Sequence, residues 1–403
     1  MGHVEKLSYP LPRPAALEPP VEWAELRKRC PVAHVTMPSG DDATLLTRYA
    51  DVRQILSDNR FGRLLNAPDA ARLSDTDSGG VFNSEMAEVL PQTGPGHERW
   101  RRMISKWFTA KRMTALRPGI EAMANQLIDE MTAKGQPADL KAALAFPLPV
   151  WVICDLLGVP ESDRDRFAHW SDSLLNLTRY TQQEMETAQR EFAAYMAEHI
   201  AARRRAPGDD LLSELVLATD AEGRGLSDAE LVATGQGLLI AGHETTANMI
   251  AKMTGMLLAD RTRWERLLED RSLVRTAVEE ALRFDANLGF GMVRYIDQDV
   301  EVGDEQITSG TTVVCDMAAA NRDETEFAEA DEMDLARTPN PHLTFGAGPH
   351  SCLGQSLART ELQTVLTVLL DRVPSLALAV PAEDLRRVEG LVVGGLSALP
   401  VRW

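Results

Sequence analysis

Residues 345–354 read FGAGPHSCLG and lead directly into the amphipathic stretch QSLARTELQTVLTVLLDRV at 355–373. Glycines at 346, 348 and 354 permit tight turns and a close approach of the backbone to a flat ligand. The stretch that follows predicts a helix, so Cys352 lies at a helix N-terminus, where the dipole and free N–H groups favour a thiolate and lower its pKa. A lone intracellular cysteine is usually an inert buried side chain, but this ten-residue frame favours a thiolate ligand.

The longest predicted helix begins after Ser227, which forms a capping box with Glu230 three residues later. Its pattern continues to about Ala259, a length of roughly 48 Å at 1.5 Å per residue, so the helix must cross the whole core. Its middle reads AGHETT at 241–246, and these glycine, acidic and β-branched residues are poor helix formers. A local rule broken in the middle of a core helix indicates a functional position.

The rest of the chain predicts a mainly α protein with a minor β region, organised as one domain over residues 1–403. Segments 31–38 and 43–49 are expected to be short strands, 299–315 a hairpin, and the tail from about 376 further short strands. Segments 113–133, 161–178 and 183–205 have apolar residues at helical spacing.

Composition narrows the function classes. The net charge of −18 argues against nucleic acid or anionic membrane as the main partner. The four cysteines, Cys30, Cys154, Cys315 and Cys352, are far apart and lack CxxC spacing, which suits reduced thiols in a cytoplasm. The first twenty residues contain no apolar run long enough for a signal peptide or an anchor. We therefore expect a cytoplasmic monomer.

Several motifs together resemble those of the cytochrome P-450 family, from about residue 30 to the C-terminus. FGAGPHSCLG is similar to the family's FGxGxHxCxG, and Glu280 to Arg283 matches its ExxR on a helix. Residues 319–337 are similar to its ANRDPxxFxxPDxFDxxR, and AGHETT to its AGxE/D-TT. The resemblance is strongest to soluble bacterial enzymes that act on polyketides and related natural products. It implies the P-450 fold, in which a long central helix crosses a haem b above the cysteine-ligand loop.

The resemblance also implies roles for particular residues. Cys352 would be the axial iron ligand, Phe345 would shield the sulfur side of the haem, and Glu280 with Arg283 would form a structural pair joined by the region of Arg337. The haem propionates would meet cationic or hydrogen-bonding partners, which buried carboxylates require. These partners would be His97, Arg101, Arg294 and His350.

The implied reaction inserts one oxygen atom from O2 into a C–H bond or an alkene, with electrons from NAD(P)H through a ferredoxin reductase and a ferredoxin. Glu244 and Thr245 are the candidates for proton delivery, while Thr246 would steady a helix break through a back-bond to a carbonyl. An acidic ferredoxin would dock on a basic patch over the thiolate side of the haem. That patch consists of Arg99, Arg102, Lys106, Lys111 and Arg112.

Three alternatives remain open. A peroxide-driven peroxygenase on the same fold tends to lack the acid–alcohol pair, and a non-catalytic haem sensor would need neither that pair nor an electron donor. A cysteine hydrolase using Cys352 and His350 fits poorly, because residues two apart on a turn point apart and no third orienting group follows.

The expected substrate pocket takes one wall from the loop at residues 64–90. The other lining residues are Leu238, Ala241, Gly242 and Thr245, the segment from Asn287 to Val293, and the segment from Leu391 to Val393 around Val392, with glycines at 242, 289 and 291 adding room. Because these positions are mostly small or aliphatic, we expect a bulky hydrophobic natural product such as a macrolide or other polyketide. Two departures from the family pattern lie nearby: TGPGH at 93–97 replaces DPPxH, and Asn287 replaces proline. Asn287 would either bind a polar substituent of the substrate or cap its own loop.

Overall fold

The computed structural model describes residues 7–63, 65–73, 88–175, 179–286, 290–388 and 393–403. The helices in this part of the chain are α1 (Glu22–Arg29), α2 (Tyr49–Ser57), α4 (Gly94–Ser105), α5 (Ala110–Ala115), α6 (Arg117–Lys134), α7 (Pro147–Leu156), α8 (Arg164–Leu175), α9 (Gln182–Arg205), α10 (Leu211–Leu217), α11 (Asp228–Ala259), α12 (Arg261–Glu269), α13 (Val274–Phe284), α14 (Met317–Ala320) and α15 (Gln355–Arg372). A single π-helical turn, η2, spans Lys141–Ala145.

The strands are short. They are β1 (Leu7–Ser8), β2 (Val32–Thr36), β3 (Asp42–Leu46), β4 (Ala138–Asp139), β5 (Met292–Ile296), β6 (Val300–Val302), β7 (Glu305–Ile307), β8 (Thr311–Cys315), β9 (Ala377–Leu378), β10 (Arg387–Val388), β11 (Gly395–Leu396) and β12 (Pro400–Arg402). The predicted mainly α fold with a minor β region is confirmed.

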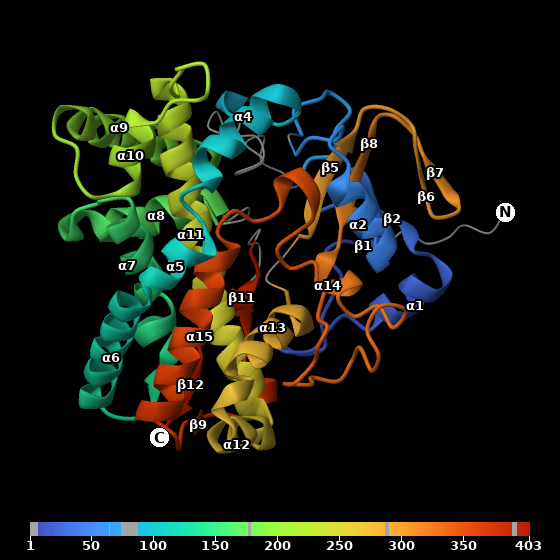
Figure 1. Cartoon of the computed structure of the whole chain (residues 1–403). Helices are drawn as coiled ribbons and strands as arrows, with labels where there is room; N and C mark the ends of the chain where they lie inside the picture. Colours follow the sequence, from blue (N-terminus) through green and yellow to red (C-terminus); the bar gives the residue numbers. More distant parts are fainter. Residues whose placement is uncertain (1–6, 64, 74–87, 176–178, 287–289, 389–392) are drawn as a thin grey trace.

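The largest sheet has the strand order β1-β2-β3-β8-β5. β3 pairs with β8 in parallel and β8 with β5 antiparallel, so strands distant in sequence become neighbours. In Figure 1 this sheet lies on one side of the molecule and most of the helices lie on the other. The expected hairpin at 299–315 is present as β6 and β7, while β8 continues into the large sheet.

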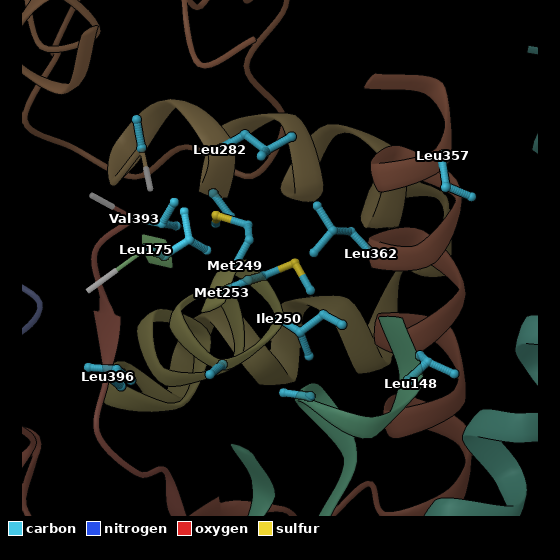
Figure 2. Close-up of a cluster of buried hydrophobic side chains, with 14 of the residues drawn as sticks. Leu148, Leu175, Met249, Ile250, Met253, Leu282, Leu357, Leu362, Val393 and Leu396 are labelled. Carbon is cyan, nitrogen blue, oxygen red and sulfur yellow. The ribbon is translucent and has the colours of Figure 1, made fainter. Parts of the chain in front are cut away.

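The central helix α11 begins where the sequence predicted. Ser227 accepts a hydrogen bond from the backbone N–H of Glu230, and the Glu230 side chain accepts one from the backbone N–H of Ser227. From Leu231 to Leu258 most of its residues are buried, because helices from several parts of the chain surround it. Figure 2 shows the packing around Met249, Ile250 and Met253 of α11. Their neighbours in that view are Leu148, Leu175, Leu282, Leu357, Leu362, Val393 and Leu396.

Two local predictions were wrong. The expected single helix over 113–133 is divided at Leu116 into α5 and α6, with Pro118 in the first turn of α6, a position that tolerates a missing N–H. The expected break at AGHETT is also absent, since α11 is continuous from Asp228 to Ala259. Burial on several sides compensates for poor helix propensity there.

None of the described helices is long and apolar enough to cross a membrane.

Candidate active site

The Cys352 loop is shaped by its own backbone and by α2. The N–H of Cys352 donates to the carbonyl of Phe345 at 2.7 Å, which closes the loop. Gly348 has φ +67°, and a Cβ there would lie 2.5 Å from Cα of Ser57 at the end of α2. This glycine is therefore required for the close approach of the loop to α2, whereas the sequence suggested an approach to a ligand. The loop ends at Gly354, the N-cap of α15.

Cys352 lines a cavity of about 460 Å³, which is less open to solvent than the other large pocket of the described residues. The cavity lies between α4, α11, β5 and the segment from Thr344 to Leu362, all of which contribute lining residues. A more open groove of about 830 Å³ runs along Asp41–Thr44 and Ala67–Arg72, but it contains none of the predicted haem or catalytic residues. We therefore place the candidate site in the cavity that Cys352 lines.

The protein environment by itself does not lower the pKa of Cys352, contrary to the expectation from its place near a helix start. Burial raises the pKa, and this outweighs the hydrogen bond from the Gly354 N–H and the charges of Arg101 and Arg359. A thiol that coordinates a metal ion is nevertheless deprotonated outright. The thiolate would thus depend on the iron and be assisted by these three groups.

Five cationic or potentially cationic side chains line one side of the cavity. They are Arg63, His97, Arg101, Arg294 and His350. The rings of His97 and His350 lie with their centroids 4.4 Å apart. Burial together with the neighbouring arginines lowers the pKa of His350 to about 2 and that of Arg63 to about 10. These side chains thus gather positive charge at one site of the cavity.

The cluster fits a ligand with carboxylates. No aspartate or glutamate occurs among the described lining residues. The Nε atoms of Arg63 and Arg294 are buried without a hydrogen-bond partner in the part of the chain that the structure describes, and an unpaired buried donor is costly. Two haem propionates would supply the missing acceptors and counter-charge, and Cys352 would meet the iron.

The Glu280–Arg283 pair is fully buried, and the structure supplies the third partner expected from the resemblance. Arg283 binds both carboxylate oxygens of Glu280 at 2.8 Å, and Arg337 binds them at 3.1 and 3.2 Å. Arg283 also donates to the carbonyls of Asn321 and Ala330. This network therefore fixes the segment 321–337 against α13.

Asn321 links this network to the cysteine loop. Its side-chain oxygen accepts from the N–H of Leu343 at 2.7 Å, and its nitrogen donates to the hydroxyl of Thr344 at 2.9 Å. Phe345, the first residue of the loop, follows directly and carries Arg359 over its ring at 4.5 Å. The pair on α13 thus supports the cysteine loop through one asparagine.

Glu244 and Thr245 are adjacent on α11, and of the two only Thr245 is among the described lining residues of the cavity. Thr245 lines the cavity, and its hydroxyl donates a hydrogen bond to the carbonyl of Ala241 at 2.8 Å. The sequence predicts such a bond to a backbone carbonyl for Thr246, but in the structure Thr245 makes it. Glu244 accepts from Asn248 at 3.0 Å, and its other oxygen lies 3.9 Å from Nε2 of His243. Nδ1 of His243 donates its proton in a hydrogen bond to the carbonyl of Leu239 at 2.8 Å, and burial lowers the pKa of this imidazole.

The predicted substrate positions are only partly assembled. Leu238, Ala241 and Gly242 line the cavity, and the pocket wall near the C-terminus includes Val393. Val293 is fully buried and absent from the lining, because alternate residues of β5 face opposite ways and the neighbours Met292 and Arg294 face the cavity. Asn287, Val392 and most of the loop at 64–90 lie outside the described residues.

Two glycines have other roles than making the pocket roomy. A Cβ at Gly242 would lie 2.8 Å from the Ile153 side chain, so its absence lets α7 pack closely on α11. Gly291, with φ +64°, faces Val314 and the backbone of Cys315 and is not among the lining residues.

Sequence reasoning missed several lining residues that only tertiary packing reveals. Arg63 follows α2, more than thirty residues before His97, and no motif marks it. Trp100 lies one helical turn after His97, and its indole N–H donates to Thr234 of α11 at 2.9 Å. Ile153 and Leu175 come from α7 and α8. The helical period of HERWRR could have signalled Trp100, whereas the others required the fold.

The predicted basic patch is smaller than expected. Arg99 binds Asp220 at 2.6 Å and the carbonyls of the following loop, and Arg112 pairs with Glu214 at 3.2 Å while covering the ring of Trp107. Of the predicted patch, Arg102, Lys106 and Lys111 are exposed, and no described ion pair engages them.

A cysteine loop before a helix, a cluster of arginines and histidines that fits carboxylates, and Thr245 around one apolar cavity are the arrangement expected of a haem-thiolate protein. Comparison with known proteins agrees: the Cytochrome P450 family model matches residues 162–373. Over the whole length of both chains, the protein is 41% identical to mycinamicin IV hydroxylase/epoxidase of Micromonospora griseorubida and 41% identical to nocardicin C N-oxygenase of Nocardia uniformis subsp. tsuyamanensis.

Solved structures show the same similarity. The mixed-function P450 MycG superposes with a TM-score of 0.89 at 40% identity, covering 99% of this chain and 100% of that one. CYP105P1 in complex with filipin I gives a TM-score of 0.91 at 36% identity, with 99% of each chain covered. The chain therefore belongs to the cytochrome P450 family. It is an oxidoreductase of the monooxygenase type, and its cofactor is haem.

Proposed function

We propose that the protein is a haem b monooxygenase that hydroxylates or epoxidises a bulky hydrophobic natural product, a macrolide or another polyketide. The observation that carries this proposal is that Cys352, the carboxylate-binding cluster and Thr245 line one apolar cavity, with Glu244 next to Thr245 on α11. Haem, when bound, supplies the activation of O2 and the insertion of one oxygen atom. The protein supplies the ligand, the binding site and the protons.

The residues around the haem position divide into three tasks. Cys352 would be the axial ligand, and Phe345, which lines the cavity beside it, would cover the sulfur side. Arg101, Arg294 and their neighbours in the cluster would hold the propionates through charge-assisted hydrogen bonds. Among them, Arg101 also donates to the carbonyl of Ser351, one residue before the ligand. Propionate binding and the shape of the cysteine loop are thereby joined.

Protons would enter the cavity along α11. The Thr245 hydroxyl donates a hydrogen bond to the carbonyl of Ala241. A hydroxyl oxygen that donates in this way can also accept a hydrogen bond, here from a donor on the cavity side. Glu244 lies mostly buried one residue earlier, where Asn248 holds one of its oxygens. A carboxylate in this place can take a proton from water and pass it towards Thr245.

The lining above the haem position favours a large apolar substrate. Leu238, Ala241, Met249 and Leu175 present aliphatic or thioether surface, and only a few polar side chains, such as Thr234, interrupt it. The similar hydroxylase/epoxidase is named after mycinamicin IV, and filipin I is bound to one similar structure. Both compounds support a large natural product as the substrate class.

Electrons would come from NAD(P)H through a ferredoxin reductase and an acidic ferredoxin docked near Arg102, Lys106 and Lys111. The alternatives, a peroxide-driven enzyme or a haem sensor without turnover, are less favoured because each can do without the Glu244–Thr245 pair. A peroxide-driven enzyme would turn over with hydrogen peroxide alone, and a haem sensor would show no turnover.

The test is a spectral titration of the haem protein with mycinamicin IV, a set of other macrolides, a long-chain fatty acid and a small terpene. The proposal predicts a shift to the high-spin spectrum with at least one macrolide and an oxygenated product with NADPH, reductase and ferredoxin. Tight binding of the fatty acid alone would contradict the substrate class, and product formation with peroxide only would contradict the electron source.

A further inference from the structure

A lysine lies in the fully buried part of α11. Lys252 has an exposed fraction of 0% and lies two helical turns beyond Glu244. Its Nζ atom lies 2.9 Å from Oδ2 of Asp285, and it donates to the carbonyls of Asp285 at 2.9 Å and Ala286 at 3.3 Å. An ammonium group has three N–H donors; two of them donate to these carbonyls, and the Asp285 carboxylate lies beside the group as an ion pair.

Asp285 is the centre of a cluster that joins three parts of the chain. Besides Lys252, Arg13 from the N-terminal segment lies 3.2 Å from one of its oxygens, and Arg387 of β10 lies 3.5 Å from the other. Burial by itself would raise the pKa of Asp285, but these three cations outweigh it and hold the pKa below its usual range. The carboxylate is therefore charged whenever the protein is folded near neutral pH.

The two arginines are also tied to the N-terminal segment. Arg13 donates to the carbonyl of Glu18 at 3.3 Å and covers the ring of Trp23, and Arg387 donates to the carbonyl of Ala16 at 3.0 Å. Each member of the cluster thus has a fixed geometry. Buried charges of this kind contribute little net stability compared with apolar packing, but each charge must lie close to its partner, so the pairs fix the relative positions of the segments that carry them.

The cluster lies at the start of two segments that lead to the cavity. Asp285 and Ala286 follow α13 directly, and a few residues later Met292 and Arg294 line the cavity. Arg387 pairs with Leu396 across the β10–β11 hairpin, whose Val393 also lines the cavity. None of the residues in the ion cluster itself lines the cavity.

The hairpin also lies directly against α11. A Cβ at Gly395 would come within 2.0 Å of Oδ1 of Asn248, the residue one turn before Lys252 that donates to Glu244. In Figure 2 Val393 and Leu396 lie next to the side chains of α11. Small shifts of the hairpin therefore change the cavity wall beside the catalytic segment.

We propose that Lys252 is a positioning residue for the substrate: together with Arg387 it holds Asp285 and Ala286, at the end of α13, and the paired strands β10 and β11 in place on α11. The cavity wall then has one shape, set by side chains that do not touch the ligand. This inference rests on the proposed function only in taking the haem cavity as the substrate site.

The first experiment compares two azoles that both bind haem iron through a nitrogen. Imidazole is too small to reach the distant wall, whereas clotrimazole carries three further aromatic rings that extend away from its imidazole. In the Lys252→Met holoenzyme we expect the Kd of imidazole to stay within twofold of wild type. The Kd of clotrimazole should change by about two- to thirtyfold, the range produced by mutations between coupled positions.

Arg387→Met is the second variant, because Arg387 is at the edge of the cluster and its loss disturbs the core less. Arg386→Met is its matched control: the same charge is removed at the adjacent position, but Arg386 is 69% exposed and donates to carbonyls of its own loop. Arg387→Met should change the clotrimazole Kd and Arg386→Met should not. Equal effects of both variants, or equal changes for both azoles, would overturn the proposal.

Hydrogen exchange gives a second readout that does not depend on haem. Lys252→Met and Arg387→Met should increase exchange in peptides from β5 and β11 while leaving α6 unchanged. Unchanged protection of β5 and β11 in both variants would overturn the positioning role. If wild-type protein shows no spectral response to imidazole, the proposed function fails, and the exchange data alone decide this inference.

Discussion

Replacing Glu280 by glutamine should destabilise the fold more than any surface charge change. Glu280 is fully buried and accepts from Arg283, Arg337, the Asn340 side chain and the backbone N–H of Asp334. Glutamine has nearly the same volume, but it removes the negative charge and points an NH2 group at one set of these donors. Arg283, with an exposed fraction of 0%, would then be a buried cation without its counter-charge.

The expected decrease in the free energy of unfolding follows from the loss of this ion pair. Removing one partner of a buried ion pair costs about 3–5 kcal/mol. With an unfolding entropy of about 2.1 cal/mol/K per residue, the whole chain of 403 residues changes by about 0.8 kcal/mol per degree, so the Tm should fall by about 4–6 °C.

The assay is thermal unfolding followed by far-UV circular dichroism, with Glu265→Gln as the control. Glu265 lies on α12 and pairs with Arg261 at 3.2 Å, but it is 57% exposed. An exposed pair at i, i+4 contributes about 0.3–0.5 kcal/mol, so the control should lose less than about 1 °C. A Glu280→Gln protein as stable as the control would refute the reasoning, because it would show that Arg283 does not depend on this carboxylate.

Three other predictions follow from the site. Arg63→Met removes one donor to a haem carboxylate, so haem transfer to apomyoglobin should be about ten- to a hundredfold faster; an unchanged rate would remove Arg63 from the cluster's function. Thr245→Ala should retain haem and substrate but divert electrons to hydrogen peroxide, measured as NADPH consumed per product, and unchanged coupling would exclude Thr245 from proton delivery. Glu279 is partly buried, which would raise its pKa, but His342 and Arg359 lower it to about 2. A lowered folded-state pKa adds stability above the ordinary value near 4.5, and this stability is lost as the pH falls from about 4.5 towards 2; urea titrations should therefore show a shallower acid-side loss in Glu279→Gln, and equal slopes would contradict the pairing.

The sequence predicted what depends on local pattern. The capping box at Ser227 and Glu230 located the start of α11, and FGAGPHSCLG located the ligand loop and the helix after it. ExxR anticipated a pair, and the resemblance anticipated its third partner near Arg337. Except for the third partner, which came from the resemblance, residues close in sequence carry the whole signal.

What required the structure depends on packing between distant segments. Arg63 joins the carboxylate-binding cluster only because α2 lies against the cysteine loop, where Gly348 meets Ser57. Gly242 was predicted to widen the pocket, but in the structure the absence of a side chain there makes room for Ile153 of α7. Val293 was predicted to line the pocket, but the sequence does not show which face of β5 points to the core, and in the structure Val293 lies on that face. Arg99 was predicted to belong to the basic patch, but its charge is paired with Asp220, which lies more than a hundred residues away in the sequence.

The most direct test of thiolate ligation is the spectrum of the reduced haem protein with CO, for wild type and Cys352→Ser. Ligation by Cys352 predicts a far red-shifted Soret band in the wild type, since the sulfur donates electron density to the iron. The serine variant should fold, as judged by circular dichroism, but lose that band together with turnover. A normal red-shifted band in Cys352→Ser would place the ligand elsewhere and contradict the central claim.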